Sequence, residues 1–455
     1  MDGTIGTNGS SLLLQIEKKN GSIVGKPYKI EITSGSGIIQ EATLAMGDDA
    51  QLWSEHTPNL YTLRAVIKNG ENKEEQCRTF GLREFKANGT RFEINGQPVF
   101  LRGTLECCIF PLTGYPAMDN TYWAKIYNQC KAHGLNHVRF HSWCPPEAAF
   151  AVADSMGIYL QVECAGWATV GDGGYSDQWF RDESDRILKE YGNHPSFCMM
   201  AYGNEPGGAN QATYLSGLID YWKSKDLRRV YTSAGGWPYV ENADYWDPME
   251  PRIQRWGEGM NSIINAQQPR TDFDFADIIR KNMPTVSHEV GQWCVYPNFK
   301  EIEKYTGVLK AKNFEIFQET LKEHHMADLA DDFLFASGRL QTLCYKADIE
   351  GALRTPGFAA SNYSTCMIFR DKEQPLSAFL IPSGKKNGYV TPEEYSTFCN
   401  KISSSRPFPE NGLAEQRDIE RSPRSGTFRR KPLQAANITW EISNQAGERL
   451  HRATS

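Results

Sequence analysis

Apolar and β-forming positions alternate or cluster in short runs through the first 86 residues. These runs lie at 11–17, 28–33 and 60–67, and turns rich in Gly and Asn, such as Lys68-Asn-Gly70, separate them. Short alternating runs are typical of half-buried strands, and several strands at this spacing favour a β-sandwich. The pattern therefore predicts a β domain over residues 1–86.

After the hairpin turn predicted at Asn95-Gly96, strand-length apolar runs alternate with helical segments. The expected strands lie at 99–101, 135–141, 158–163, 197–202 and 230–235, and the expected helices at 120–133, 146–155, 177–191 and 212–223. Such alternation requires a parallel sheet, and this many units predicts a (β/α)8 barrel, which we place over residues 87–400. A doubly wound open sheet is the alternative, but no G-x-G-x-x-G fingerprint supports it.

The regular pattern is lost after Phe358, where an eighth barrel strand is expected. Residues 362–369 are poor in strand signals, so the eighth strand is doubtful and the barrel would not close without it. We interpret 361–386 and 403–430 as reading-frame excursions, because codons for a plausible strand give these residues when shifted by one base. Residues 401–455 are then expected to be disordered or an incomplete β segment.

Composition excludes several classes of protein. The net charge of −6 without a dominant basic block argues against a nucleic-acid partner, and no apolar run is long enough to span a membrane. The eleven cysteines include no C-x-x-C pair, which favours free thiols over a zinc site or a disulfide framework. The first residues lack the features of a signal peptide, so export to the periplasm or the medium is suspected only for a longer parent protein.

Two apolar runs end in acids at positions that suit catalysis. The run from Phe197 breaks into Gly203-Asn-Glu-Pro206, and the short strand that begins at Pro284 leads to Ser287-His-Glu289. Carboxyl ends of barrel strands carry catalytic groups, and a glycosidase needs two carboxylates with different pKa values. A separation of about 5–5.5 Å would give retention, and about 6.5–9.5 Å would give inversion. A solvent-exposed Asn-Glu turn is the structural alternative.

Four motifs in this order resemble glycoside hydrolase family 2, which includes β-galactosidases, β-glucuronidases and β-mannosidases. They are 53–63, 81–103, Gly203-Asn-Glu205 and Ser287-His-Glu289, and the resemblance covers residues from about 50 to 358. The resemblance implies an immunoglobulin-like sandwich followed by a (β/α)8 barrel. It also implies exo-acting hydrolysis of a terminal β-glycosidic bond, with retention, on an oligosaccharide or glycoside and without an organic cofactor.

The resemblance also assigns roles to residues. Glu205 matches the acid/base, Glu289 the nucleophile and Asn204 the partner of the sugar 2-hydroxyl. The segment Arg102-Gly-Thr-Leu-Glu106 stands where β-galactosidases of the family carry His-x-Asp, which argues against a magnesium site and a β-galactosidase specificity.

Further candidates for substrate contact match the family's site residues less specifically. Arg139 resembles an arginine that would keep the nucleophile ionised, although a structural ion pair is the alternative. Glu163 and Glu106 follow strand-like runs and could bind hydroxyls or serve as structural acids. The remaining candidates share an aromatic or imidazole ring that could contact or stack on a sugar: His141, Trp143, His288, Trp293, Trp256, Trp167 and Trp237.

Two readings without catalysis stay open at this point. One is a glycan-binding remnant whose C-terminal third is damaged, and the other is a structural module that binds protein. The sequence indicates neither the sugar and its linkage nor an oligomeric state.

Overall fold

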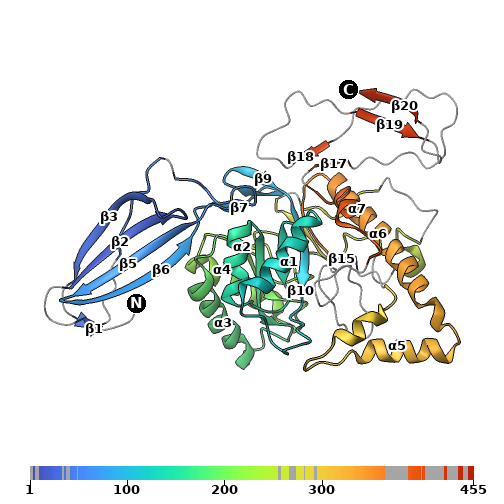
Figure 1. Ribbon diagram of the computed structural model, residues 1–455, viewed down its shortest axis with the longest axis horizontal. Helices are drawn as coiled ribbons and strands as arrows, with labels where there is room; N and C mark the ends of the chain where they lie inside the picture. Colours follow the sequence, from blue (N-terminus) through green and yellow to red (C-terminus); the bar gives the residue numbers. More distant parts are fainter. Residues whose placement is uncertain are drawn as a thin grey trace.

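The computed structural model describes residues 4–5, 10–32, 35–36, 41–48, 50–254, 258–265, 273–280, 282–291, 295–363, 388–400, 402–404, 425–427, 439–443 and 449–454. An elongated β domain at the N-terminal end leads into a larger domain of strands and helices (Figure 1). No helix in these ranges is long and apolar enough to cross a membrane.

The N-terminal β domain contains a four-stranded antiparallel sheet in the order β3-β2-β5-β6. Its strands are β2 (Ser10–Lys18), β3 (Ile23–Ile32), β5 (Tyr61–Asn69) and β6 (Asn72–Phe80), and a short pair joins β1 (Thr4–Ile5) to β4 (Gly35–Ser36). Gly70 has a φ of 59° in the tight turn between β5 and β6, at a turn that the sequence predicts. This part confirms the predicted sandwich-like β domain.

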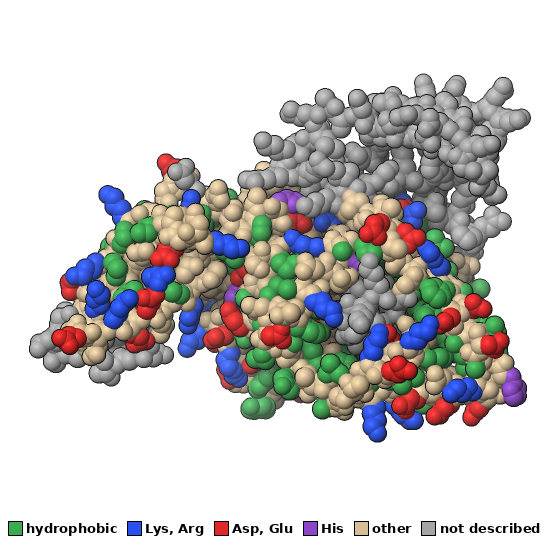
Figure 2. Space-filling view, in the orientation of Figure 1, with side chains coloured by type: hydrophobic (Ala, Val, Ile, Leu, Met, Phe, Trp, Pro, Cys, Tyr) green, Lys and Arg blue, Asp and Glu red, His purple; other side chains and the backbone are tan. Residues whose placement is uncertain are grey.

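A small apolar cluster of Ile16, Val24 and Tyr61 packs with Leu44 and Met46 on one side of the sheet. The surface of this domain carries acidic and basic side chains interspersed with each other (Figure 2). Cross-strand ion pairs such as Arg64 with Glu17, at 2.8 Å, account for part of this pattern. The domain therefore presents no block of a single charge on the face that the figure shows.

A three-stranded antiparallel sheet connects the two domains. It consists of β7 (Phe85–Asn88), β8 (Arg91–Ile94) and β9 (Gln97–Val99). Asn95 and Gly96 have φ values of 53° and 72°, which confirms the predicted hairpin turn. Phe85 packs against Tyr159, and Phe92 packs against Tyr245, so this sheet covers the N-terminal ends of the barrel strands.

Seven parallel strands form the second domain in the order β14-β13-β12-β11-β10-β16-β15. They are β10 (Leu101–Glu106), β11 (His137–Phe140), β12 (Tyr159–Gly166), β13 (Phe197–Gly203), β14 (Val230–Tyr231), β15 (Thr285–Val290) and β16 (Phe358–Tyr363). Most of their residues are buried, as expected for strands covered on both faces.

Helices alternate with these strands, and the first four lie at the predicted positions. They are α1 (Asn120–Ala132), α2 (Glu147–Met156), α3 (Tyr175–Tyr191), α4 (Gln211–Lys225), α5 (Lys312–Glu323), α6 (Ala330–Arg354) and α7 (Pro392–Ser396), with 3-10 helices η1 (Gly259–Asn261), η2 (Ala276–Ile278), η3 (Phe299–Lys304) and η4 (Ala327–Leu329). A capping box between Thr391 and Glu394 begins α7.

Residues 246–248 connect the two edges of this sheet. Trp246 donates its backbone N–H to Pro284 at 2.9 Å, and Gly236 donates to Asp247 at 2.9 Å. Parallel bridges from Trp246 to Thr285 and from Pro248 to Gly236 accompany these bonds. These residues occupy the position of a sixth strand, and the domain is a TIM barrel.

The sequence pattern made an eighth barrel strand doubtful, and this expectation was wrong for residues 358–363. β16 begins at Phe358 and pairs in parallel with both β10 and β15, so the wall expected to stay open carries a strand. It starts four residues before the stretch that the sequence singles out. The reading-frame interpretation of 361–386 and 403–430 falls mostly outside the described residues and stays a prediction.

Two short antiparallel pairs follow toward the C-terminal end. They are β17 (Ile402–Ser404) with β18 (Ser425–Thr427) and β19 (Thr439–Ser443) with β20 (Arg449–Thr454). These strands agree with the expectation of an incomplete β segment in this part of the chain. The domain limits at residues 86 and 400 stay a prediction.

Candidate active site

Glu205 and Glu289 lie at the carboxyl ends of β13 and β15. Both have a φ of 38°, in the left-handed region that costs an ordinary residue about 1–2 kcal/mol. Glu289 also lies in an irregular stretch of the β15–β16 ladder, between the pairs at Ser287 and Val290. Bulges and backbone strain at a barrel rim redirect side chains and gather at functional sites. The backbone at both carboxylates therefore departs from regular strand geometry.

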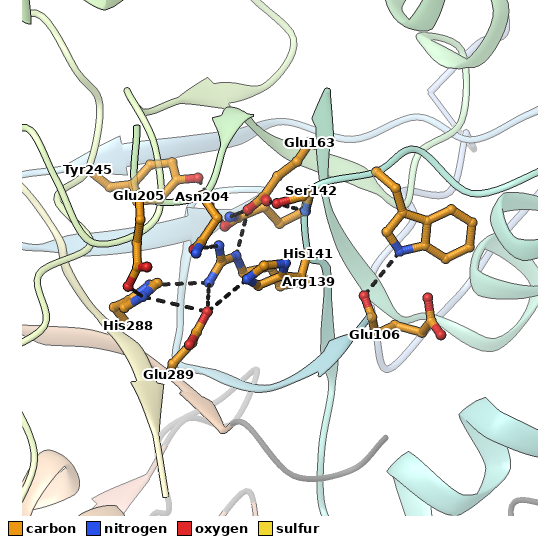
Figure 3. A network of polar contacts seen from close by, with 12 residues as sticks. Glu106, Arg139, His141, Ser142, Glu163, Asn204, Glu205, Tyr245, His288 and Glu289 are labelled. Atoms are coloured by element: carbon orange, nitrogen blue, oxygen red, sulfur yellow. Dashed lines mark hydrogen bonds and ion pairs between the residues drawn. The ribbon is translucent and has the colours of Figure 1, made fainter. Parts of the chain in front are cut away.

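Arg139, on β11, is the buried centre of a polar network (Figure 3). Its Nε donates to Glu163 Oε1 at 2.6 Å, and its Nη2 donates to Asn204 Oδ1 at 2.8 Å. Its Nη1 lies 3.6 Å from Glu289 Oε1. One guanidinium thereby connects the ends of β11, β12, β13 and β15, which is the planar, multiple-donor geometry that arginine supplies.

Glu163 holds Arg139 from the β12 side. Besides the arginine, its carboxylate accepts from the backbone N–H of Ser142 at 2.7 Å and from Gln161 Nε2 at 3.0 Å. The Tyr245 hydroxyl in turn donates to Gln161 Oε1 at 3.0 Å. Since protein donors engage both oxygens of Glu163, the geometry favours the structural alternative for this acid, and its contact with substrate stays a prediction.

Glu289 is surrounded by groups that can carry positive charge. Its Oε1 lies 3.0 Å from His141 Nε2 and 3.6 Å from His288 Nε2, in addition to Arg139. Burial would raise the pKa of Glu289, but the charge of His288, the hydrogen bond and charge of His141, and Arg139 hold it well below its usual range. The carboxylate is therefore ionised at neutral pH, as a nucleophile requires.

Both carboxylates contact the same histidine. His288 Nε2 lies 3.3 Å from Glu205 Oε1 and 3.6 Å from Glu289 Oε1. The two oxygens therefore cannot be farther apart than the sum of these distances, about 6.9 Å, and they reach it only in a straight line through the nitrogen. The Glu205 side chain is 23% exposed and that of Glu289 only 5%, so Glu289 is the deeper of the two.

Asn204 precedes Glu205 and is buried. Its Oδ1 accepts from Arg139, which fixes the orientation of the amide, and its Nδ2 has no hydrogen-bond partner within the described residues. A buried donor without a partner costs free energy unless a ligand or water satisfies it. Asn204 therefore offers a hydrogen-bond donor beside the carboxylate pair.

The structure does not bring every predicted residue into this cluster. Trp143 packs among Phe110, Trp123 and Phe140, and its Nε1 donates to the backbone oxygen of Glu106 at 3.1 Å. Burial raises the pKa of Glu106 to about 8. Because its ring packs among aromatic side chains, Trp143 belongs to the apolar core of the domain. Trp256 and Trp293 lie outside the described residues, and their contacts with sugar stay predictions.

Asp247 is a buried acid near the site that the sequence analysis does not single out. Neither of its carboxylate oxygens has a hydrogen-bond partner in the described ranges, and burial raises its pKa to about 6. The segment Tyr245-Trp-Asp-Pro248 ends with an acid directly before a proline, as Gly203-Asn-Glu-Pro206 does. This shared acid–proline pattern is the sequence feature that could have identified Asp247 as a candidate.

No group of three His, Cys, Asp or Glu side chains among the described residues is arranged to hold a metal ion. The site instead combines an ionised buried carboxylate, a second carboxylate nearer to solvent, and donors for hydroxyl groups. This arrangement can attack an electrophilic carbon and exchange a proton with a leaving group or a water.

Comparison with known proteins places this chain in a family. The sequence model described as "Glycosyl hydrolases family 2" matches residues 6–83, and "Glycosyl hydrolases family 2, TIM barrel domain" matches residues 85–279. The chain belongs to glycosyl hydrolase family 2. Glu205 lies within the matched barrel region of this family 2 chain, whereas Glu289 lies ten residues beyond it.

Relatives of this family 2 chain include several glycosidases. Beta-galactosidase 2 of Enterobacter cloacae is 24% identical over 257 residues, which cover 54% of the chain and 24% of that protein. Another is a putative beta-glucuronidase of Formosa agariphila, 25% identical over 237 residues, with 48% and 22% covered. The chain thus spans less than a quarter of the length of these curated relatives.

Solved structures share the fold of this family 2 chain. The beta-glucuronidase of Parabacteroides merdae superimposes with a TM-score of 0.62 at 15% identity, covering 86% of this chain and 49% of that one. The beta-galacturonidase of Eisenbergiella tayi, bound to galacturonate, gives 0.58 at 15% identity, with 87% and 68% covered. At these identities the likeness extends to the fold alone.

Proposed function

We propose that this chain hydrolyses a terminal β-glycosidic bond with retention, with Glu289 as nucleophile and Glu205 as acid/base. The observation that carries the proposal is that two carboxylates from separate barrel strands contact one nitrogen, His288 Nε2. Family membership supports a glycosidase, and these contacts support the assignment of roles within it.

In the first step, Glu289 attacks the anomeric carbon while Glu205 donates a proton to the leaving oxygen. The bond between sugar and leaving group breaks, and a glycosyl ester forms on Glu289. The charges of His141, His288 and Arg139, which keep Glu289 ionised before attack, also favour its release as a carboxylate later. Glu205, nearer to solvent, is placed to reach the leaving group.

In the second step, Glu205 takes a proton from a water that attacks the same carbon, and Glu289 leaves. Two displacements at one carbon return its original configuration. The upper limit of about 6.9 Å between the carboxylate oxygens supports this course, because about 6.5–9.5 Å is needed for a water between them in an inverting site. Only a wide angle between the two contacts at His288 Nε2 would reach the lower end of that range.

Asn204 supports the proposal from the sugar side. Its Nδ2 is a buried donor without a protein partner among the described residues, next to the acid/base in the chain. A bond from this donor to the 2-hydroxyl that strengthens in the transition state would contribute to rate rather than to affinity alone.

The proposal predicts turnover that depends on both carboxylates. On a panel of 4-nitrophenyl β-glycosides with galactose, glucuronic acid, mannose or glucose, at least one substrate should be hydrolysed. Glu205→Gln and Glu289→Gln should each lower kcat/KM on it by at least about 10²-fold. Steady-state release of nitrophenol measures this.

The control is Glu303→Gln, an exposed acid in the 3-10 helix η3, which should retain the parent rate. If neither carboxylate variant loses activity, the assignment of the two roles is contradicted. A folded parent chain, as judged by circular dichroism, that hydrolyses no glycoside would contradict the proposed activity and favour a chain that only binds glycans.

A further inference from the structure

Trp167 and Trp237 flank Glu205 from the two neighbouring strands. Trp167 directly follows β12 and Trp237 lies beyond β14, and β13 lies between these strands in the sheet. Backbone bonds hold the three segments together at their ends: Asn204 donates to Gly166 at 2.8 Å and Glu205 donates to Gly235 at 3.0 Å. The two tryptophans therefore follow the strands on either side of the one that leads to Glu205, at one rim of the barrel.

Both indoles are exposed, and each makes a contact with a residue near the site. Trp167 is 57% exposed and Trp237 is 37% exposed, whereas Trp53, Trp123 and Trp222 are fully buried. Trp237 Nε1 donates to the backbone oxygen of Pro206 at 2.8 Å, and the Trp167 ring meets His141 edge-on with centroids 5.2 Å apart. Large apolar rings held in place in contact with water are typical of binding surfaces.

The depth of the carboxylates sets the direction in which a substrate must lie. Glu289 is almost fully buried and Glu205 is partly exposed, so the sugar that becomes attached to Glu289 occupies the inner position. The acid/base contacts the glycosidic oxygen, and the leaving group continues from that oxygen toward solvent. Rings beside Glu205 at the rim are therefore placed to meet the leaving group.

We infer that Trp167 and Trp237 form a leaving-group subsite that takes a pyranose ring, so that the preferred substrate is an oligosaccharide. The inference rests on the proposed function. A pyranose presents a face of C–H groups that packs on an indole, and it buries apolar ring surface that water otherwise covers. A methyl leaving group is too small to cover either ring.

The test compares two substrates whose leaving groups differ in size and not in chemical type. For each glycone that supports turnover, the β-linked disaccharide and the methyl β-glycoside both release an alcohol, so their ratio of kcat/KM reports binding of the leaving group. Trp167→Ala and Trp237→Ala should each lower kcat/KM for the disaccharide by at least about 10-fold and change the methyl glycoside less than about 2-fold.

Two further variants serve as controls for this test. Trp167→Phe keeps a ring and should retain most of the preference for the disaccharide, and Tyr28→Ala, an exposed ring on β3, should leave both substrates unchanged. Equal losses on both substrates, or no loss on either, would overturn the subsite while the proposed function stands. A parent chain that hydrolyses a 4-nitrophenyl β-glycoside but not the disaccharide would also overturn the subsite, and one that hydrolyses none of these glycosides would overturn both the subsite and the proposed function.

Discussion

At the scale of single residues, the site is a set of buried charges that pair with one another, and Asp247 is the exception. Arg139 has partners from three other strands or their ends. Arg139 could be named only by its resemblance to a family arginine, whereas Glu163 and Glu289 also follow strand-like runs in the sequence. The sequence could not show that backbone and amide donors engage Glu163, since Ser142 and Gln161 meet it only through the fold.

Asp247 predicts a dependence of stability on pH. Burial raises the pKa of Asp247 in the folded chain to about 6 from an ordinary value near 3.8. The folded chain therefore holds this proton more tightly than the unfolded chain does. The resulting contribution to the free energy of unfolding is complete below the ordinary pKa and is lost as pH rises through 6. At about 1.4 kcal/mol per pKa unit, the loss is roughly 3 kcal/mol. Asp247→Asn should therefore raise the thermal midpoint above that of the parent at pH 8, with the difference vanishing near pH 4.

Asp328→Asn serves as the matched control, because Asp328 is exposed and its midpoint shift should be small at every pH. A variant of Asp247 that is no more stable than the parent at pH 8 would show that the buried carboxyl carries no such cost.

At the scale of elements, strands with long buried runs could be predicted from the sequence and strands defined by a few bonds could not. β13 consists of seven buried residues, and Gly203 and Pro206 mark its carboxyl end, which is a strong local signal for a strand. Residues 246–248 complete the barrel through isolated bridges, so they lack the length that gives a strand its periodic pattern. β16 was doubted because its apolar part begins before the stretch that lacks strand signals.

The strand ends also carry backbone strain that a substitution can reveal. Because Glu205 has a φ of 38°, the free energy of unfolding of Glu205→Gly should exceed that of Glu205→Ala by about 1 kcal/mol. Denaturant unfolding of the two variants measures this difference. The same pair at Glu319, an exposed position in α5, should show the reverse order by a similar amount, because glycine weakens a helix. Alanine more stable than glycine at both sites would mean that Glu205 is unstrained.

At the scale of the whole molecule, the N-terminal β domain supports the barrel at the end opposite the site. Trp53 is fully buried, donates its Nε1 to the backbone oxygen of Asp154 at 2.8 Å and packs edge-on against Tyr159. Arg83 donates to the backbone oxygens of Pro195 and Phe197 just before and at the start of β13. The order of motifs predicted both domains, whereas these contacts depend on long-range packing that no local pattern records.

The most direct measurement is to trap the intermediate on the intact chain. Incubation with the 2-deoxy-2-fluoro glycosyl fluoride of the sugar that supports turnover should slow the second step more than the first and leave the sugar attached. Peptide mass spectrometry should then find the added mass on the peptide that contains Glu289, and Glu289→Gln should carry none. A label on any other residue, or an active chain that forms no adduct and releases the inverted anomer first, would contradict the account.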